Sequence, residues 1–391
     1  MIRDFLKKIN YSVDWLLFGA LFFIAMAGIL TMNSFLPSLP TQTGHAGQIA
    51  KDTLFIRQII WLAISIFVLF LTSLIDWRFL RRTSSIAVLF AISCITLLAL
   101  FSIGSVFKGA QSWFNLGAFA FQPIDFVKIV LVILLAKYFS RRHIEIANVR
   151  HIIISGLYTF IIFILVFLQP DFGSSVIIFL IWLAMVLVSG ISKKHLLLVF
   201  LSGLLAFGGL WFFVFKDYQK VRIVSFINPL ADLRGAGYNS YQSTIAVGSG
   251  EIWGKGVGLG SQSKLKFLPE YETDFIFAAF SEEWGFIGVV VLFTLYGVVF
   301  WRIIDISKKG ATNFETLYGL GLASVFFSHF IIHVGMNIGL LPVTGITMPF
   351  MSYGGSHMLA EFLGIGILFG QRSYSRAINK EEAKNEIIGV V

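Results

Sequence analysis

Residues 84–104 read SSIAVLFAISCITLLALFSIG, a stretch of 21 positions without a charged side chain. As a helix rising about 1.5 Å per residue, it would cross the ~30 Å hydrocarbon core of a bilayer. Runs of this kind occupy most of the chain. They predict about ten transmembrane helices, at residues 14–34, 54–74, 84–104, 123–139, 151–169, 172–191, 196–215, 275–301, 315–341 and 355–370. We therefore expect an all-α polytopic membrane protein with a single transmembrane domain over residues 1–391.

The composition agrees with this fold class, because 57% of the residues are hydrophobic and 13% are charged. A soluble domain would carry about 25% charged residues. The net charge of +9 does not indicate nucleic-acid binding, since the basic residues cluster in short loops between apolar runs. The single cysteine, Cys94, can form no intrachain disulfide. No signal peptide is expected, because the first apolar run is long and no small-residue cleavage site follows it.

The distribution of Lys and Arg predicts the topology. Every second segment between apolar runs, beginning with the N-terminus, is basic. The other short segments contain very few Lys or Arg residues. By the positive-inside rule, both termini lie in the cytoplasm. The segment at 216–274, between the seventh and eighth helices, is then a long extracytoplasmic segment of loops and short interfacial helices rather than an independent domain. Residues 380–391 are expected to form a loose cytoplasmic tail.

Polar and ionisable side chains within apolar runs cost free energy in a membrane, so each is a candidate functional residue. A structural ion pair or a snorkelling side chain could explain any one of them. Nearly all of them fall in the predicted outer half of the bundle, which chance would not produce; Asp14, at an inner helix start, is the exception. The set comprises Arg57, Asp125, Lys128, Asp171, Asp274, Glu282, Glu283, His333, Asn337, His357 and Glu361.

Spacing along two helices gives more detail. Asp125 and Lys128 stand at i and i+3, so their side chains can meet. At about 100° per residue, Glu282 is turned roughly 80° from Asp274 around the eighth helix, and Glu283 is turned roughly 180°. One carboxylate can therefore face an external cavity while another braces a neighbouring helix. The candidate partners for such a brace are Arg57, Lys128 and His333.

Several long motifs resemble the SEDS family (shape, elongation, division and sporulation). They are WFNLGAFAFQP (113–123), QPDFGSS (169–175), NPLADLRGAGY (228–238), GYNSYQSTIAVGSG (237–250), GKGVGLGSQ (254–262), FLPEYETDFIFAAFSEEWGFIG (267–288) and GMNIGLLPVTGITMPFMSYGGS (335–356). The resemblance covers nearly the whole chain. Within the family, the PVTG motif resembles the rod-elongation members called RodA, whereas the division members called FtsW tend to carry lysine in place of Thr344.

The resemblance implies ten transmembrane helices in a GT-C-like arrangement and a peptidoglycan glycosyltransferase activity. Such an enzyme joins lipid II units into β-1,4 glycan strands on the outer face of the bacterial cytoplasmic membrane during elongation, releasing polyprenyl pyrophosphate. The implied partners are lipid II, the nascent strand, a class B penicillin-binding protein transpeptidase and other membrane proteins of the elongation complex. The family's essential acid matches Asp274, and the acid of its QPD motif matches Asp171.

The chain departs from the family pattern at the fourth helix. The usual Gln-Pro-Ser-Glu motif reads Gln-Pro-Ile-Asp at 122–125, although Lys128 remains. The basic residue usual just before Trp113 is Ser112. These departures concern how a groove around the fourth helix would hold its substrate, and they leave the Asp274 motif intact.

Asp274 is the candidate catalytic base, because a sugar hydroxyl is a poor nucleophile at neutral pH and needs a group that takes its proton. The departing pyrophosphate needs positive charge. A basic side chain or a divalent cation such as Mg²⁺ or Mn²⁺ could supply it, although the sequence contains no clear metal motif and gives no metal ligands. The candidate cationic side chains are Arg57, Lys128, Arg222, Lys255 and Lys266.

The remaining candidates for substrate binding have simpler explanations that the sequence leaves open. Lys266 can face anionic headgroups, and Trp113 can be an interfacial anchor or a platform for a sugar ring. Gly354 and Gly355 can form only a tight turn, or they can let the backbone approach a lipid headgroup. The candidate substrate-binding residues are Arg57, Trp113, Asp125, Lys128, Asp171, Arg222, Gln262, Lys266, Glu282, Ser352, Gly354 and Gly355.

Two other functions remain open on the sequence: a flippase for lipid II or another polyprenyl lipid, and a scaffold for division or elongation proteins. A flippase needs polar residues at both depths so that a headgroup can cross, and a scaffold needs no buried carboxylates. The clustering of polar residues in the outer half therefore favours the enzyme. Within the family, the division-specific member is the alternative.

Overall fold

The computed structural model describes residues 9–34, 45–107, 110–115, 117, 120–141, 149–213, 220–221, 224–226, 236–265, 267–268 and 270–388. Within these residues, ten helices of 17 to 34 residues coincide with the ten predicted segments. They are α2 (Trp15–Ser34), α3 (His45–Ser73), α4 (Thr83–Ile103), α5 (Ile124–Ser140), α6 (Val149–Leu168), α7 (Phe172–Val188), α8 (Lys193–Phe213), α12 (Ile276–Lys308), α13 (Asn313–Asn337) and α14 (Gly355–Ile388).

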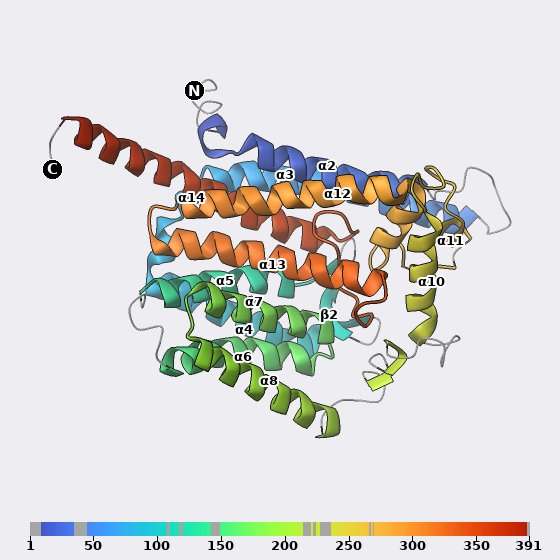
Figure 1. Ribbon diagram of the computed structural model, residues 1–391, viewed down its shortest axis with the longest axis horizontal. Helices are drawn as coiled ribbons and strands as arrows, with labels where there is room; N and C mark the ends of the chain where they lie inside the picture. The colour runs from blue at the N-terminus through green and yellow to red at the C-terminus, as the bar shows by residue number, and fades with distance from the viewer. Residues whose placement is uncertain are drawn as a thin grey trace.

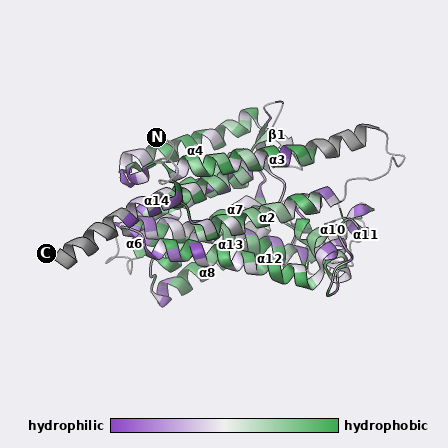
Figure 2. Cartoon of the chain, turned by 90° about the horizontal axis from the view of Figure 1, so that it is seen from above, coloured by the Kyte–Doolittle hydropathy of each residue, from purple (hydrophilic) through white to green (hydrophobic). Residues whose placement is uncertain are grey.

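The helices have the length and surface of membrane helices. Six stretches are long and apolar enough to cross a bilayer: α2, Leu54–Ser73 of α3, α4, α6, α12 and α13. The long helices lie side by side along one direction (Figure 1), with apolar residues along their lengths (Figure 2). Outward-facing Leu205 and Phe213 are 78% and 88% exposed, as side chains in contact with lipid tails would be. The prediction of an all-α polytopic membrane protein is confirmed.

Some helix boundaries differ from the predicted ones. The second helix begins at His45 rather than at residue 54, and α12 ends at Lys308 rather than at residue 301. α14 continues to Ile388, so most of the segment expected to be a loose tail has helical backbone. Polar residues at these helix ends interrupt the apolar runs. The helices predicted from hydropathy are therefore shorter than those in the structure.

The central helix of the bundle is α13, which packs against α5, α7 and α12. It is also the most thoroughly buried of the six apolar stretches. Glycine allows this close approach: a methyl group on Gly321 would lie 2.6 Å from Val132 Cγ1 and 2.7 Å from Met185 Sδ. Small residues at helix interfaces bring helices together where lipid offers no hydrophobic driving force.

Three short strands between α4 and α5 were not predicted. β1 (Ser105–Phe107), β2 (Ala110–Asn115) and β3 (Ala120–Phe121) form an antiparallel sheet in the order β1-β2-β3. Strands of two to six residues are too short to give a clear alternating pattern. The Gln111 N–H donates to the Gln169 carbonyl at 3.1 Å, which fixes β2 against the turn between α6 and α7. Trp113 is therefore held on a small sheet at this end of the bundle.

The described part of the predicted extracytoplasmic segment includes the short helices α10 (Ala236–Ser249) and α11 (Ser261–Lys264). α10 packs against α12 and α13 and stands across their ends (Figure 1). A 3₁₀ turn, η1 (Trp77–Arg81), connects α3 to α4 at the other end of the bundle.

A kink in α12 ties the membrane helices to this segment. Gly285 has φ 64° and ψ −167°, which breaks the helical hydrogen-bond ladder. Residues 251–256 fill the break: the N–H groups of Phe286 and Ile287 donate to carbonyls of Glu251 and Ile252 at 2.9 and 3.2 Å. Two further N–H groups of the same stretch donate to α12 carbonyls just before the kink. The polar groups that the kink exposes are thereby satisfied, as they must be at membrane depth.

The kink predicts a specific sensitivity to substitution. A methyl group on Gly285 would lie 2.2 Å from the Gly254 nitrogen, and its φ is unfavourable for any other residue. We expect Gly285→Ala to destabilise the protein by about 2 kcal/mol or more, measured as a lower thermal unfolding midpoint in detergent. Gly297→Ala is the matched control on the same helix, because no atom lies within 4 Å of the new methyl group. Equal shifts for the two variants would contradict this account of the kink.

Candidate active site

The loop at 338–354, between α13 and α14, returns to the start of α12 and lies beside Asp274. The Tyr353 N–H donates to the Glu272 carbonyl at 2.8 Å, and the Ser352 hydroxyl donates to the Thr273 carbonyl at 2.8 Å. Gly345 faces the acid, since a methyl group on it would lie 3.8 Å from Asp274 Oδ2. The Asp274 side chain is half-buried. The two residues before Asp274 are thus held by the loop, and its carboxylate borders the same loop.

Asn337, the last residue of α13, organises the start of α12. Its Nδ2 donates to the Asp274 carbonyl at 3.1 Å and to the His333 carbonyl at 2.8 Å. Its Oδ1 accepts from the Ala278 N–H at 3.1 Å and lies 3.3 Å from the Ser243 hydroxyl of α10. No side chain of its own caps α12. The fully buried Asn337 supplies that cap from a neighbouring helix and holds Asp274 in register with it.

The loop also contacts the start of α7, where Asp171 lies. The Asp171 side chain accepts from the Ser174 N–H at 3.0 Å and so caps α7. A methyl group on Gly173 would lie 2.7 Å from the Thr344 carbonyl oxygen. Thr344 and Gly345 are neighbours in sequence, so this part of the loop borders both the helix start at Asp171 and the carboxylate of Asp274. The structure therefore brings the two predicted acids to the same loop.

α3 fixes the opposite end of the loop. Gln58 is buried; its Nε2 donates to the Ser352 carbonyl at 3.2 Å, and its Oε1 accepts from the Gly354 N–H at 3.4 Å. The neighbouring Arg57 is exposed and hydrogen-bonds to Tyr353. Burial raises the pKa of Tyr353, against the opposing effect of the Arg57 charge, so its hydroxyl stays neutral at physiological pH.

Gly355 and Ser352, both predicted to bind substrate, make packing or hydrogen-bond contacts within the protein. A methyl group on Gly355 would lie 2.3 Å from the Trp61 ring, so glycine is needed there for packing. Ser352 is buried, and its hydroxyl also accepts from the Met348 N–H at 2.8 Å. Both residues shape the turn that leads into α14.

A buried charge network lies beneath the loop, between α5, α13 and α14. The predicted pair exists: Lys128 Nζ is 3.1 Å from Asp125 Oδ1, and both side chains are buried. Lys128 also lies 3.2 Å from His329 Nε2. His357 Nδ1 is 3.2 Å from Asp125 Oδ1, and its Nε2 is 3.0 Å from Glu361 Oε1. His357 therefore hydrogen-bonds to Asp125 through Nδ1, while its Nε2 lies within ion-pair distance of Glu361.

This network supports the loop from below. Glu361 Oε2 accepts from the Phe350 N–H at 2.8 Å. Phe350 has φ 61°, a left-handed conformation that costs a non-glycine residue free energy. Ring nitrogens of His329 and His333 lie 3.2 and 2.7 Å from the carbonyls of Thr347 and Ile346. The irregular backbone of the loop is therefore held by buried polar side chains.

Glu282 and Glu283 brace the external segment. Glu282 is fully buried, and its Oε1 lies 2.7 Å from Lys255 Nζ and accepts from the Gln262 N–H at 3.1 Å. Glu283 Oε1 accepts from the Gly258 N–H at 2.6 Å. The cation paired with Glu282 is thus Lys255, rather than Arg57, Lys128 or His333 as the sequence suggested. The sequence did not predict that the external segment folds onto α12.

For the remaining candidates from the sequence, the structure gives at most the element and the burial of the side chain. Trp113 is half-buried on β2, and Gln262 is half-buried at α11. Arg222 and Lys266 lie outside the described residues. Sequence reasoning missed His329 and Gln58, although His329 is an ionisable residue within an apolar run and the usual argument applies to it. Among the described residues, no group of three or more His, Cys, Asp or Glu is arranged to hold a metal ion.

Comparison with known proteins relates the whole chain to one family. Residues 14–377 match the family model for FtsW, RodA and SpoVE, described as cell cycle proteins. Stage V sporulation protein E of Bacillus subtilis is 34% identical over 82% of this chain and 87% of its own length. Peptidoglycan glycosyltransferase MrdB of Escherichia coli is 35% identical over 75% of this chain and 79% of its own length.

Solved structures agree with these sequence relatives. A structure described as showing the coordination of polymerization and crosslinking by a peptidoglycan synthase complex has a TM-score of 0.76 and 27% identity, covering 93% of this chain and 98% of that one. Rod shape determining protein RodA of Thermus thermophilus has a TM-score of 0.67 and 27% identity, covering 92% and 96% of the two chains.

The contacts of Asn337 predict that it positions Asp274. Asn337→Ala removes four hydrogen-bonding contacts, and we expect it to lower stability by about 2–4 kcal/mol. Hydrogen exchange should rise at residues 274–279, where the cap and the Asp274 carbonyl contact are lost. Asn313→Ala, at the exposed first position of the same helix, is the control and should change neither property. Unchanged exchange at 274–279 in Asn337→Ala would refute the positioning role.

Proposed function

The chain belongs to the FtsW, RodA and SpoVE family of cell cycle proteins, and from this membership we propose that it is a peptidoglycan glycosyltransferase of the cytoplasmic membrane. Its reaction would join lipid II disaccharide units into β-1,4 glycan strands. The observation that carries the proposal is the half-buried carboxylate of Asp274, fixed by backbone contacts at one end of a helical bundle. A lipid-tethered sugar can reach such a position while its tail stays in the bilayer.

In the proposed reaction, Asp274 acts as the general base. The 4-hydroxyl of the acceptor sugar attacks the anomeric carbon of the donor from the side opposite the pyrophosphate. The new C–O bond forms as the bond to the pyrophosphate oxygen breaks, which inverts the anomeric carbon. Asp274 takes the hydroxyl proton, and polyprenyl pyrophosphate leaves with the electron pair. A carboxylate held by its backbone and bordered by a fixed loop suits this task, because little reorganisation is needed.

The departing pyrophosphate needs a nearby cation, and Arg57 is the better-placed candidate among the described ones. It is exposed beside Tyr353 at the end of the loop, whereas Lys128 is buried and neutralised by Asp125. Lys255 is engaged with Glu282. Arg222 and Lys266 remain candidates from the sequence, and a divalent cation such as Mg²⁺ or Mn²⁺ is a further source of charge in the proposal.

We place the reaction on the extracytoplasmic face. The support for this is the excess of Lys and Arg in the loops at the other end of the bundle. On that face, an acceptor strand can grow without crossing the membrane.

The proposed setting is cell elongation, with a class B penicillin-binding protein as the transpeptidase partner. The PVTG motif at 342–345 supports the elongation role, as does the likeness to a rod shape determining protein. The likeness to a component of a peptidoglycan synthase complex that polymerises and crosslinks supports the partner.

Purified protein with labelled lipid II tests the activity directly. General base catalysis contributes about 100- to 10,000-fold, so Asp274→Ala and Asp274→Asn should lower the rate of glycan polymer formation by at least about 100-fold. Glu251→Gln is the control, because it neutralises an exposed carboxylate of the external segment and should leave the rate within about twofold of the native rate. Full polymerisation by Asp274→Ala would exclude Asp274 as the base.

Complementation tests the elongation role. In a bacterium depleted of its own elongation polymerase, this chain should restore rod shape, and in one depleted of its division polymerase it should leave cells filamentous. Cell length and width by microscopy provide the measurement. The reverse outcome would assign the chain to division.

A further inference from the structure

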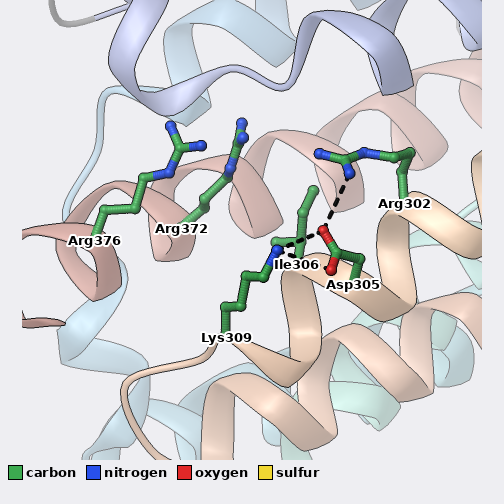
Figure 3. A pocket seen from close by; sticks show the side chains of 6 residues that line it. All are labelled: Arg302, Asp305, Ile306, Lys309, Arg372 and Arg376. Atoms are coloured by element: carbon green, nitrogen blue, oxygen red, sulfur yellow. Dashed lines mark hydrogen bonds and ion pairs between the residues drawn. The ribbon is translucent and has the colours of Figure 1, made fainter.

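A basic cavity lies at the end of the bundle opposite the candidate active site. Its volume is about 200 Å³, and it opens between the last turns of α12 and the middle of α14. In Figure 3, Arg372 and Arg376 enter from α14, while Arg302, Asp305 and Ile306 come from α12 and Lys309 directly follows it. The cavity is lined by Arg302, Asp305, Ile306, Lys309, Arg372 and Arg376.

The acids around the cavity only partly neutralise its cations. Arg302 pairs with Asp14 and lies 3.1 Å from Asp305. Arg372 is 2.8 Å from Asp14, and Lys309 is 2.9 Å from Asp305. With Arg376, four cations face two carboxylates among the residues that the structure describes, which leaves a formal excess of two positive charges there.

The most buried of these cations lacks full compensation. Burial, together with the charges of Arg376 and Arg302, lowers the pKa of Arg372 to about 10, in spite of the nearby Asp14 carboxylate. Arg376, at the rim, is exposed; its Nη1 donates to the Tyr11 carbonyl at 2.9 Å, and its guanidinium lies over the Tyr11 ring. An anion in the cavity would therefore gain both charge attraction and several N–H donors.

Two exposed tryptophans place the cavity at the depth of lipid headgroups. Trp15 follows Asp14 and is 50% exposed; Trp301 precedes Arg302 and is 58% exposed. Arg302 stacks on the Trp301 ring at 5.3 Å from its centre. Tryptophan side chains on the outside of a membrane bundle mark the interface between hydrocarbon and water. A ligand of the cavity can thus be a lipid whose tails run down the surface of the helices.

We propose that this cavity binds the phosphate group of an anionic phospholipid in the cytoplasmic leaflet. The arginines of α12 and α14 contact the phosphate oxygens, Lys309 lies near the outer part of the headgroup, and Trp301 packs along the upper part of an acyl chain. Basic pockets between transmembrane helices on the cytoplasmic side are suited to such headgroups. The site does not depend on the proposed glycosyltransferase reaction, because Asp274 lies before the first residue of α12 and the cavity lies at the other end of the helix.

Native mass spectrometry of the detergent-purified chain provides the test, with phosphatidylglycerol and phosphatidylcholine as probes. The native chain should retain phosphatidylglycerol and release phosphatidylcholine. Lys309→Gln with Arg376→Gln should weaken phosphatidylglycerol binding about 30-fold, and Arg376→Gln alone about fivefold. The double control, Lys308→Gln with Arg82→Gln, removes the same charge from exposed positions outside the cavity and should leave binding within about twofold.

Three results would overturn the proposal. Equal weakening by the two double variants would show that general surface charge attracts the lipid. Equal retention of phosphatidylcholine would show that the anionic headgroup is not recognised. Displacement of phosphatidylglycerol by inorganic phosphate at matched concentration would identify a site for a soluble anion. Thermal unfolding of each variant is measured in parallel. If the double variant unfolds, the binding of phosphatidylglycerol by Arg376→Gln alone tests the proposal.

Discussion

The hydrocarbon of a bilayer offers no water, so every backbone polar group at membrane depth needs a partner from the protein. This constraint governs the loop at 338–354, whose backbone is not helical. Helical side chains from α3, α13 and α14 supply the missing partners: Gln58, His333 and Glu361 each bind its backbone. The loop can therefore hold a fixed shape beside Asp274 without a regular secondary structure of its own.

The charge network beneath the loop joins α5, α13 and α14 through buried ionisable side chains. Two carboxylates at close range in a low dielectric would repel each other. Lys128 and His357 lie against them, and His357 joins Asp125 of α5 to Glu361 of α14. Removing one member of such a buried group leaves an uncompensated charge, which is far more costly than losing an exposed pair. Asp125 is thus part of an arrangement that spans three helices.

Hydropathy predicted where the long helices of the described residues lie and in what order, because ~30 Å of hydrocarbon sets a length that a sequence must match. Helical spacing predicted the pair of Asp125 and Lys128, because residues at i and i+3 lie on the same face of a helix. Neither hydropathy nor helical spacing could predict contacts between segments that are distant in the sequence. The cap that Asn337 provides to α12 joins residues 59 positions apart, and nothing in either local sequence specifies the other. The contacts of residues 251–258 with Glu282 and Glu283 also join distant parts of the chain, so the local sequence did not predict them.

The break at Gly285 divides α12 into a short first part, which follows directly from Asp274, and a long part that crosses the bundle. Residues 251–256 are inserted at this joint and hydrogen-bond to both parts. Four backbone hydrogen bonds therefore fix the angle between the two parts of α12. Through them the external segment is joined directly to the short helical part that follows Asp274.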